Sequence, residues 1–159
     1  MNSYTHVDSP VGRLLLCSDG IALTGLYMDV PRHAPRGLEQ AVESAGAGPL
    51  REAARQLAEY FAGDRREFDL PLRLEGTDFQ RRVWHVLKEI PYGETWSYRQ
   101  LAKRVDNPKG FRAVGLANGR NPISIFVPCH RVIGADGSLT GYGGGVERKR
   151  WLLAHEGLH

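Results

Sequence analysis

The amino-acid sequence predicts an α+β protein with two parts: a small β-sheet with one helix in residues 1–76, and a mainly helical part in residues 77–159. Short apolar runs separated by turn residues predict the sheet of the first part. Two capping-box patterns, each followed by apolar residues at helical spacing, predict the helices of the second part. A change from acidic to basic charge between the two parts supports the division.

The first part begins with three expected strands, which cover residues 4–7, 13–18 and 21–28. Asp19-Gly20 separates the second strand from the third. Both residue types tolerate positive φ, as a two-residue hairpin turn requires. The sequence therefore predicts a β-hairpin with its turn at these two residues.

A helix and an edge strand are expected to complete the first part. Six Pro and Gly residues between positions 31 and 49 indicate a surface loop over part of that stretch. Gly63 is expected to end the helix that follows. Residues 68–72 alternate apolar residues with polar or proline residues, which predicts an edge strand before a linker near residue 75. The helix is expected to place four apolar residues on one face: Leu50, Ala54, Leu57 and Phe61.

The second part begins with a helix that has recognisable signals at both ends. Thr77 and Gln80 form a capping-box pattern, in which each side chain binds a backbone donor that the helix start leaves free. The helix has to end near Ile90 because Pro91 follows.

The next elements predict a helix-turn-helix. Ser97 and Gln100 form a second capping box, which opens a short helix through about residue 105. Residues 106–110 form a turn, and residues 111–118 form another short helix. Two short helices joined by a tight turn in a basic segment are typical of this motif. Residues 123–127 are then expected to be buried and extended, and a last helix covers residues 146–155.

Charge is distributed unevenly along the chain. Residues 1–76 contain 8 Lys and Arg against 11 Asp and Glu, whereas residues 77–159 contain 13 against 7. Such a bias is expected where a protein meets a polyanion, although a solvated basic surface would explain it about as often. No apolar run is long enough for a membrane span, and residues 1–10 lack a secretory signal. We therefore expect a cytoplasmic protein without a membrane partner.

The two cysteines have different surroundings. Cys17 lies in an apolar run and is expected to be a core residue; without well-spaced histidines, no metal site is expected. Cys129 precedes His130 and Arg131, which favour a nucleophilic thiolate, and Glu156 is the best acid to orient the imidazole. In an extended chain adjacent side chains point to opposite faces. Cys129 and His130 would therefore need a bend or a bridging water to communicate.

Three further features each have two interpretations. The glycine-rich residues 141–145 form either the wall of a pocket that a ligand approaches closely or an ordinary flexible connection. Arg112, beside the small residues Ala113 and Gly115, either reaches into a DNA groove or is a phosphate contact or surface charge. Tyr98 is either a functional residue or an amphipathic core tyrosine.

Taken in order, these motifs resemble those of the O6-alkylguanine-DNA alkyltransferases. The resemblance covers residues 77–157, whereas the first part matches only in its strand-helix layout and its turn at residues 9–12. It implies an RNase H-like fold for residues 1–76, and a winged-helix-like DNA-binding fold with a helix-turn-helix for residues 77–159. The segments that carry the resemblance are Thr77-Asp78-Phe79-Gln80, Ile90-Pro91-Tyr92-Gly93-Glu94-Thr95, Ser97-Tyr98, Asn107-Pro108, Arg112-Ala113-Val114-Gly115, Asn121-Pro122, Val127-Pro128-Cys129-His130-Arg131-Val132-Ile133-Gly134 and Leu152-Leu153-Ala154-His155-Glu156-Gly157.

The resemblance implies an activity as well as a fold. It is that of a methylated-DNA–protein-cysteine S-methyltransferase, which repairs O6-alkylguanine, and by extension O4-alkylthymine, by direct reversal. The alkyl group passes irreversibly to the protein's own cysteine after base flipping, so each molecule acts once and needs no cofactor. The partner is double-stranded DNA that carries the lesion, approached from the minor groove. We expect a monomer, with cooperative assembly on DNA left open.

The same resemblance implies catalytic roles for individual residues. Cys129 accepts the alkyl group, and His130 acts through a water as the base, oriented by Glu156. Asn121 braces the active-site turn against the recognition helix. Arg112 takes the place of the extruded nucleoside.

Other positions are implied to contact the DNA or the base. Tyr98 turns the 3′ phosphate and then meets the guanine edge. The backbone carbonyls of Cys129 and Val132 accept from the base's amine, while Tyr142 and the Gly143 amide line the pocket. Small Ala113 and Gly115 let the recognition helix enter the minor groove.

Two other functions remain open on the residues alone. A DNA-binding regulator would explain the charge asymmetry, but not the combination of Cys129, His130 and Glu156 with a glycine-rich loop. A cysteine hydrolase would use the same thiol in repeated turnovers, but the sequence offers no second element suited to an oxyanion site.

Overall fold

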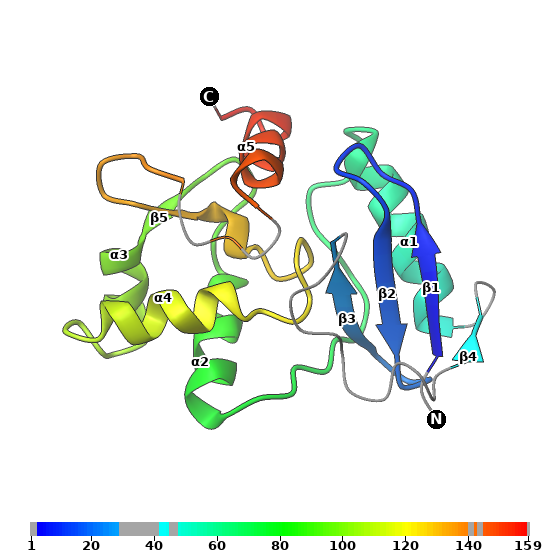
Figure 1. Ribbon diagram of the computed structural model, residues 1–159, viewed down its shortest axis with the longest axis horizontal. Coiled ribbons are helices and arrows are strands. Elements are labelled where there is room, and N and C mark those ends of the chain that lie inside the picture. Colours follow the sequence, from blue (N-terminus) through cyan, green and yellow to red (C-terminus); the bar gives the residue numbers. More distant parts are fainter. Residues whose placement is uncertain (1–2, 29–41, 45–47, 140–141, 143–144, 159) are drawn as a thin grey trace. The chain divides into compact units, whose positions relative to one another are not determined.

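A computed structural model of the chain describes residues 3–28, 42–44, 48–139, 142 and 145–158 (Figure 1). The chain separates into two compact units, Met1–Leu74 and Glu75–His159. No helix among the described residues combines the length and the apolar character that a membrane crossing needs.

The first unit contains a four-stranded sheet. Its strands are β1 (Ser3–Val7), β2 (Leu14–Ser18), β3 (Leu23–Tyr27) and β4 (Val42–Glu43), in the spatial order β3-β2-β1-β4. β2 is antiparallel to both of its neighbours, whereas β4 pairs with β1 in parallel. The three predicted strands are therefore confirmed; the first begins one residue earlier than predicted, and the other two are slightly shorter. The sequence did not indicate β4.

The turn between β2 and β3 is longer than the predicted two residues. It spans residues 19–22, with the Asp19 amide donating to the Ala22 carbonyl at 3.3 Å. The Asp19 carboxylate accepts from the amides of Ile21 and Ala22 at 2.9 and 2.8 Å. An aspartate that binds the backbone two and three residues ahead stabilises this wider turn. The prediction was correct about the hairpin and wrong about its turn.

Helix α1 (Gly48–Phe61) contacts β1, β2 and β3. Its predicted core face was partly wrong, because Ala54 and Phe61 are only half-buried. Gly63 adopts a φ of 84° and its amide donates to the Tyr60 carbonyl, which confirms the predicted helix end. The face that is buried consists of Leu50, Ala53, Gln56, Leu57 and Tyr60.

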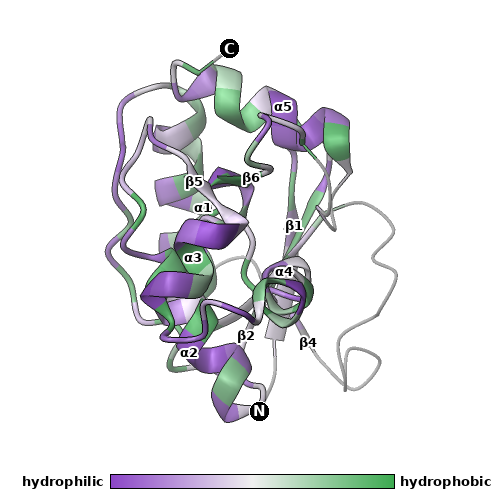
Figure 2. Cartoon of the chain, turned by 90° about the vertical axis from the view of Figure 1, so that its left-hand side faces the viewer, coloured by the Kyte–Doolittle hydropathy of each residue, from purple (hydrophilic) through white to green (hydrophobic). Residues whose placement is uncertain are grey.

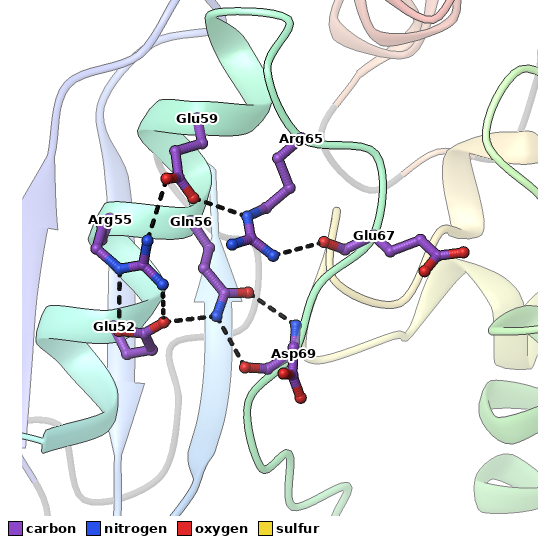
Figure 3. Close-up of polar contacts among 7 residues, drawn as sticks. All are labelled: Glu52, Arg55, Gln56, Glu59, Arg65, Glu67 and Asp69. Atoms are coloured by element: carbon purple, nitrogen blue, oxygen red, sulfur yellow. Dashed lines mark hydrogen bonds and ion pairs between the residues drawn. The ribbon is translucent and has the colours of Figure 1, made fainter.

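Polar contacts attach the segment after α1 to the helix (Figure 3). The Gln56 side chain donates to the Asp69 carbonyl and accepts from the Asp69 amide, both at 2.8 Å. Arg65 adds an ion pair to Glu59 at 2.8 Å. The predicted edge strand over residues 68–72 is reduced to a single parallel pairing of Leu72 with Leu23. Gln56 occupies the backbone groups that a longer strand would have used.

The described residues of the second unit form four α-helices, a short 3₁₀ helix and a pair of short strands. The helices are α2 (Asp78–Leu87), α3 (Tyr98–Arg104), α4 (Phe111–Gly119) and α5 (Val146–His155). The strands β5 (Trp96–Ser97) and β6 (Val132–Ile133) pair in parallel. Both predicted capping boxes are present, at Thr77 and at Ser97. α2, α3 and α4 each carry hydrophilic and hydrophobic stretches, as expected of helices that share a core (Figure 2).

Trp84 connects α2 to α4. Its side chain is 2% exposed, and its indole nitrogen donates to the Ala117 carbonyl at 2.8 Å. The bond reaches a backbone group in the last turns of α4, a helix that also contacts α3. A buried tryptophan needs such a partner for its N–H group.

Replacing Trp84 with phenylalanine should destabilise the second unit. The change keeps an aromatic ring but leaves the buried Ala117 carbonyl without this donor, which costs about 1–3 kcal/mol. Urea unfolding followed by circular dichroism measures the loss. Trp96→Phe is the control, because Trp96 is only half-buried and stacks under Arg104. An equal loss in the two variants would show that the indole hydrogen bond is not the cause.

Candidate active site

The chain folds back on itself just before Cys129. Ile125 has a φ of 73°, and around it the Phe126 amide donates to the Ser124 carbonyl at 2.9 Å. A β-branched residue rarely adopts this conformation, which marks a strained turn. Residues 123–127 were predicted to be buried and extended. Burial is largely confirmed, but the extended conformation is wrong, because apolar composition alone does not distinguish a buried strand from a buried turn.

Asn121 holds this turn closed. Its side-chain nitrogen donates to the Val127 carbonyl at 2.7 Å, and its side-chain oxygen accepts from the Ile123 amide at 3.0 Å. The same side chain hydrogen-bonds to the Cys129 thiol. The structure thus brings Asn121 to the turn and to the thiol together.

A second tight turn aims Cys129 and His130. The Cys129 amide donates to the Val127 carbonyl at 2.8 Å across Pro128, and the 3₁₀ helix η2 (Cys129–Arg131) follows. Three residues complete one turn of such a helix, so neighbouring side chains diverge by much less than in a strand. The objection that Cys129 and His130 would face opposite sides is removed by this bend.

Glu156 lies at the centre of a buried polar cluster. Its carboxylate accepts from His130 Nε2 at 2.7 Å and from two nitrogens of Arg131 at 2.8 and 3.1 Å. The Gly93 amide approaches it at 3.3 Å, and Arg131 also donates to the Ile90 carbonyl at 2.7 Å. Burial alone would raise the pKa of Glu156, but the bonds and charges of His130 and Arg131 hold it below its ordinary value. Glu156 is therefore a carboxylate at neutral pH.

The partner of His130 determines its tautomer. A carboxylate only accepts, so Nε2 carries the proton and Nδ1 is left with a free lone pair. Nδ1 is buried and has no hydrogen-bond partner among the described residues. Burial lowers the pKa of His130, with Arg131 and Lys149 acting in the same direction against Glu156. The imidazole is therefore neutral and able to accept a proton at Nδ1.

The Cys129 thiol is 3% exposed, and burial raises its pKa. Hydrogen bonds from Asn121 and Ser124 and the charge of Lys149 oppose this increase without reversing it. The expectation that His130 and Arg131 favour a resting thiolate is corrected: Arg131 is committed to Glu156 and Ile90. The resting side chain is a neutral thiol, and its ionisation has to accompany the reaction.

Lys149 is a site residue that the sequence analysis missed. Its side chain is fully buried, and its ammonium donates to the Val132 carbonyl. The ammonium lies 5.9 Å from the centre of the Tyr98 ring and 6.0 Å from that of Tyr142. Burial lowers the pKa of Lys149 to about 8, although the charge of Cys129 acts in the opposite direction. In the sequence, the only feature that could have indicated Lys149 was its position on the face of the last helix that is buried.

Tyr98 and Tyr142 lie close enough to the thiol for its charge to affect both pKa values, and the Val132 amide donates to the Cys129 carbonyl. Tyr142 is 9% exposed, and burial together with the charge of Cys129 raises its pKa well above the ordinary value, whereas a hydrogen bond with Ser124 acts in the opposite direction. Tyr98 is half-buried, and burial likewise raises its pKa. Gly143 lies outside the described residues. Within the described part of the chain, no three His, Cys, Asp or Glu side chains gather as a metal site would require.

Comparison with known proteins assigns both units to one family. A family model for the DNA-binding domain of 6-O-methylguanine DNA methyltransferase matches residues 78–158, and a model for its ribonuclease-like domain matches residues 2–74. This chain belongs to the 6-O-methylguanine DNA methyltransferase family. Membership confirms the predicted fold class, with a ribonuclease-like first domain and a DNA-binding second domain.

Relatives in this methyltransferase family match nearly the whole chain. The methylated-DNA–protein-cysteine methyltransferase of Mycobacterium tuberculosis is 52% identical over 156 residues, which cover 98% of this chain and 93% of the relative. The protein of that name from Methanosarcina acetivorans is 50% identical over 154 residues, or 97% of each chain. The crystal structure of M. tuberculosis OGT in complex with DNA matches at a TM-score of 0.88 and 51% identity, covering 97% of this chain and 92% of that one.

In this methyltransferase, the second helix of the predicted helix-turn-helix is α4, which presents a mixed surface. Arg112 and Ala113 are exposed near its start, and Leu116 is exposed one turn after Arg112. Gly115 is half-buried, and a side chain there would begin 3.6 Å from the Tyr98 ring. That distance is an ordinary van der Waals contact, so α4 lies against Tyr98 at this position. The DNA contacts expected of Arg112 and Ala113 remain predictions.

Buried Lys149 should make stability depend on pH. The unfolded chain keeps the ammonium protonated up to its ordinary pKa of 10.5, whereas the folded chain releases the proton near pH 8. Between these values the unfolded state binds more protons, so the contribution of Lys149 to stability becomes more favourable as pH rises. We expect the free energy of unfolding of the wild type to increase relative to that of Lys149→Met as the pH rises from about 7 to about 10. Chemical denaturation of both proteins across this range measures the difference; a constant or opposite trend would contradict the assignment.

Proposed function

We propose that this protein repairs O6-alkylguanine in DNA by transferring the alkyl group irreversibly to Cys129, once per molecule. The observation that carries the proposal is the buried arrangement of a thiol followed by an imidazole whose free Nδ1 can accept a proton and whose Nε2 is bound to Glu156. A soft sulfur nucleophile suits displacement at an sp³ carbon of the alkyl group.

In the proposed reaction, the Cys129 proton passes through a water to Nδ1 of His130 as the sulfur attacks. A carbon–sulfur bond forms and the bond from the alkyl carbon to the guanine oxygen breaks. Glu156 stabilises the imidazolium that forms transiently. The proton then returns to the guanine, so the products are a thioether on the protein and unmodified guanine. The thioether is stable to water, which explains the limit of one turnover.

Surrounding groups are proposed to lower the barrier to this step. Hydrogen bonds from Asn121 and Ser124 and the charge of Lys149 favour the sulfur as it becomes negative. These groups offset the free-energy cost of burying a thiolate. Their effect is therefore greatest when negative charge develops on the sulfur. Tyr98 and Tyr142 both lie close enough to the sulfur for its charge to affect their own pKa values.

We further propose that the lesion is flipped out of double-stranded DNA approached from the minor groove. The target carbon is inaccessible inside the duplex, and extrusion costs less for a lesion that pairs poorly. Exposed Arg112 fills the space that the base leaves, while Ala113 and Gly115 allow close approach of α4. Action on O4-alkylthymine, a monomeric state and pocket contacts by Gly143 are part of the same proposal. A cytoplasmic location suits it, since a reducing compartment keeps the thiol available.

Mass spectrometry tests the transfer directly. After incubation with DNA that contains O6-methylguanine, we expect one added methyl group per molecule, on the peptide that carries Cys129. Cys129→Ala should abolish transfer while retaining DNA binding. Cys17→Ala is the matched control and should transfer normally, because burial raises the pKa of Cys17 to about 11. Continued turnover, or a label on another residue, would refute the proposed function.

The proposed base also predicts the pH dependence of transfer. The pKa of His130 lies below its ordinary value of 6.5, so the neutral, proton-accepting form persists as pH falls through that value. The single-turnover rate constant should therefore change by less than about twofold between about pH 8 and about pH 6.5. Rapid-quench measurements over this range provide the test. A half-maximal rate at pH 6.5 or above would show that a group with an ordinary imidazole pKa is the base.

A further inference from the structure

Asn118 is a buried amide that is only partly hydrogen-bonded. It lies on α4 and is 1% exposed. Its side-chain nitrogen donates to the Cys129 carbonyl at 3.4 Å, which determines the orientation of the amide, since a carbonyl oxygen can only accept. The side-chain oxygen is buried and has no hydrogen-bond partner among the described residues.

Asn118 lies next to residues of the reactive centre. Gly115, one turn earlier on α4, faces the Tyr98 ring, and a hydrogen bond from the Asn118 side chain lowers the pKa of Tyr98, as a donating nitrogen does. Asn118 therefore lies between Tyr98 and the backbone of Cys129. The Val132 carbonyl is held nearby in the same unit by Lys149.

An unpartnered buried acceptor costs free energy that the fold has to offset. The cost is recovered when a ligand brings a donor to it. Two oxygens can therefore accept from a ligand here, Asn118 Oδ1 and the Val132 carbonyl, which has a second lone pair beyond the one that Lys149 uses. The Cys129 carbonyl already accepts from the Asn118 side chain and from the Val132 amide.

O6-alkylguanine has one group that matches this set of acceptors. Alkylation of the oxygen leaves N1 without a proton, so the exocyclic 2-amino group supplies the only N–H donors of the base. Its two hydrogens can satisfy two acceptors at once. A base that lacks this group would leave Asn118 Oδ1 unpaired in the complex, which is a strong basis for discrimination.

We propose that Asn118 Oδ1 accepts a hydrogen bond from the 2-amino group of the extruded base, so that residue 118 determines the preference for 2-aminopurine lesions. The inference rests on the proposed alkyl transfer to Cys129 and adds a specificity-determining residue on α4. Asn118 both contacts the base and, through its nitrogen, positions the Cys129 carbonyl.

The test compares two DNA substrates that differ only in this amino group, O6-methylguanine and O6-methylhypoxanthine. Second-order rate constants for transfer are measured for the wild type and for Asn118→Leu, which keeps the size of the side chain and removes its polar atoms. The wild type should favour O6-methylguanine, and Asn118→Leu should reduce that preference by roughly 3- to 10-fold, the effect of one hydrogen bond. Asn118→Ala should do the same and serves if the leucine variant does not fold.

Leu116→Ala is the control on the same helix. Because Leu116 is exposed, its replacement should change the rate constants for the two substrates by the same factor. A purely structural role of Asn118 would likewise slow both substrates equally and leave the preference intact, and this outcome would overturn the inference. If the wild type transfers no methyl group from either substrate, the proposed function itself fails. If the wild type transfers the methyl group but the Asn118 variants keep its preference, only the assignment of Asn118 is contradicted.

Discussion

The buried carboxylate of Glu156 is the interaction on which the rest of the site depends. It connects the end of α5 to His130 and Arg131 in η2 and to the backbone at Gly93. Arg131 extends the connection to the Ile90 carbonyl beyond α2. A buried charge is tolerated only when it is paired and its hydrogen bonds are satisfied, so these segments have to reach their places together. One carboxylate thereby determines the imidazole tautomer. It also connects the end of α5, Gly93 and Ile90 to the segment that carries Cys129.

The environment of Cys129 combines protection with readiness to react. Burial keeps the thiol neutral at rest, and a neutral, inaccessible thiol resists oxidation and unwanted alkylation. Asn121 and Lys149 nevertheless lie where they stabilise negative charge on the sulfur. For a residue that is consumed by a single reaction, this arrangement delays ionisation until a substrate is in position. The strained turn at Ile125 belongs to the same arrangement, because it aims the thiol and is held closed by Asn121.

Local hydrogen bonding explains which elements could be predicted. Both capping boxes, the end of α2 before Pro91 and the bounds of α5 follow from contacts within a few residues, and all of them are present. The errors arose where distant residues intervene. Gln56 was left out of the buried face of α1, although it binds the backbone of Asp69, 13 residues along the chain. Residues 123–127 are apolar enough for a strand, but Asn121 holds them in a turn instead.

By itself, the sequence determined the capped helices and the order of motifs around Cys129, because these depend on neighbours along the chain. It also indicated Glu156 as the acid for His130. Only the tertiary structure decided that Arg131 would bind Glu156 rather than the thiol, that the charge of Lys149 would act on the sulfur, and that Asn118 would bind the Cys129 carbonyl. Burial and hydrogen-bond geometry at those places depend on segments far apart in the chain, and the free energy of a buried charge or amide is set by all of them at once.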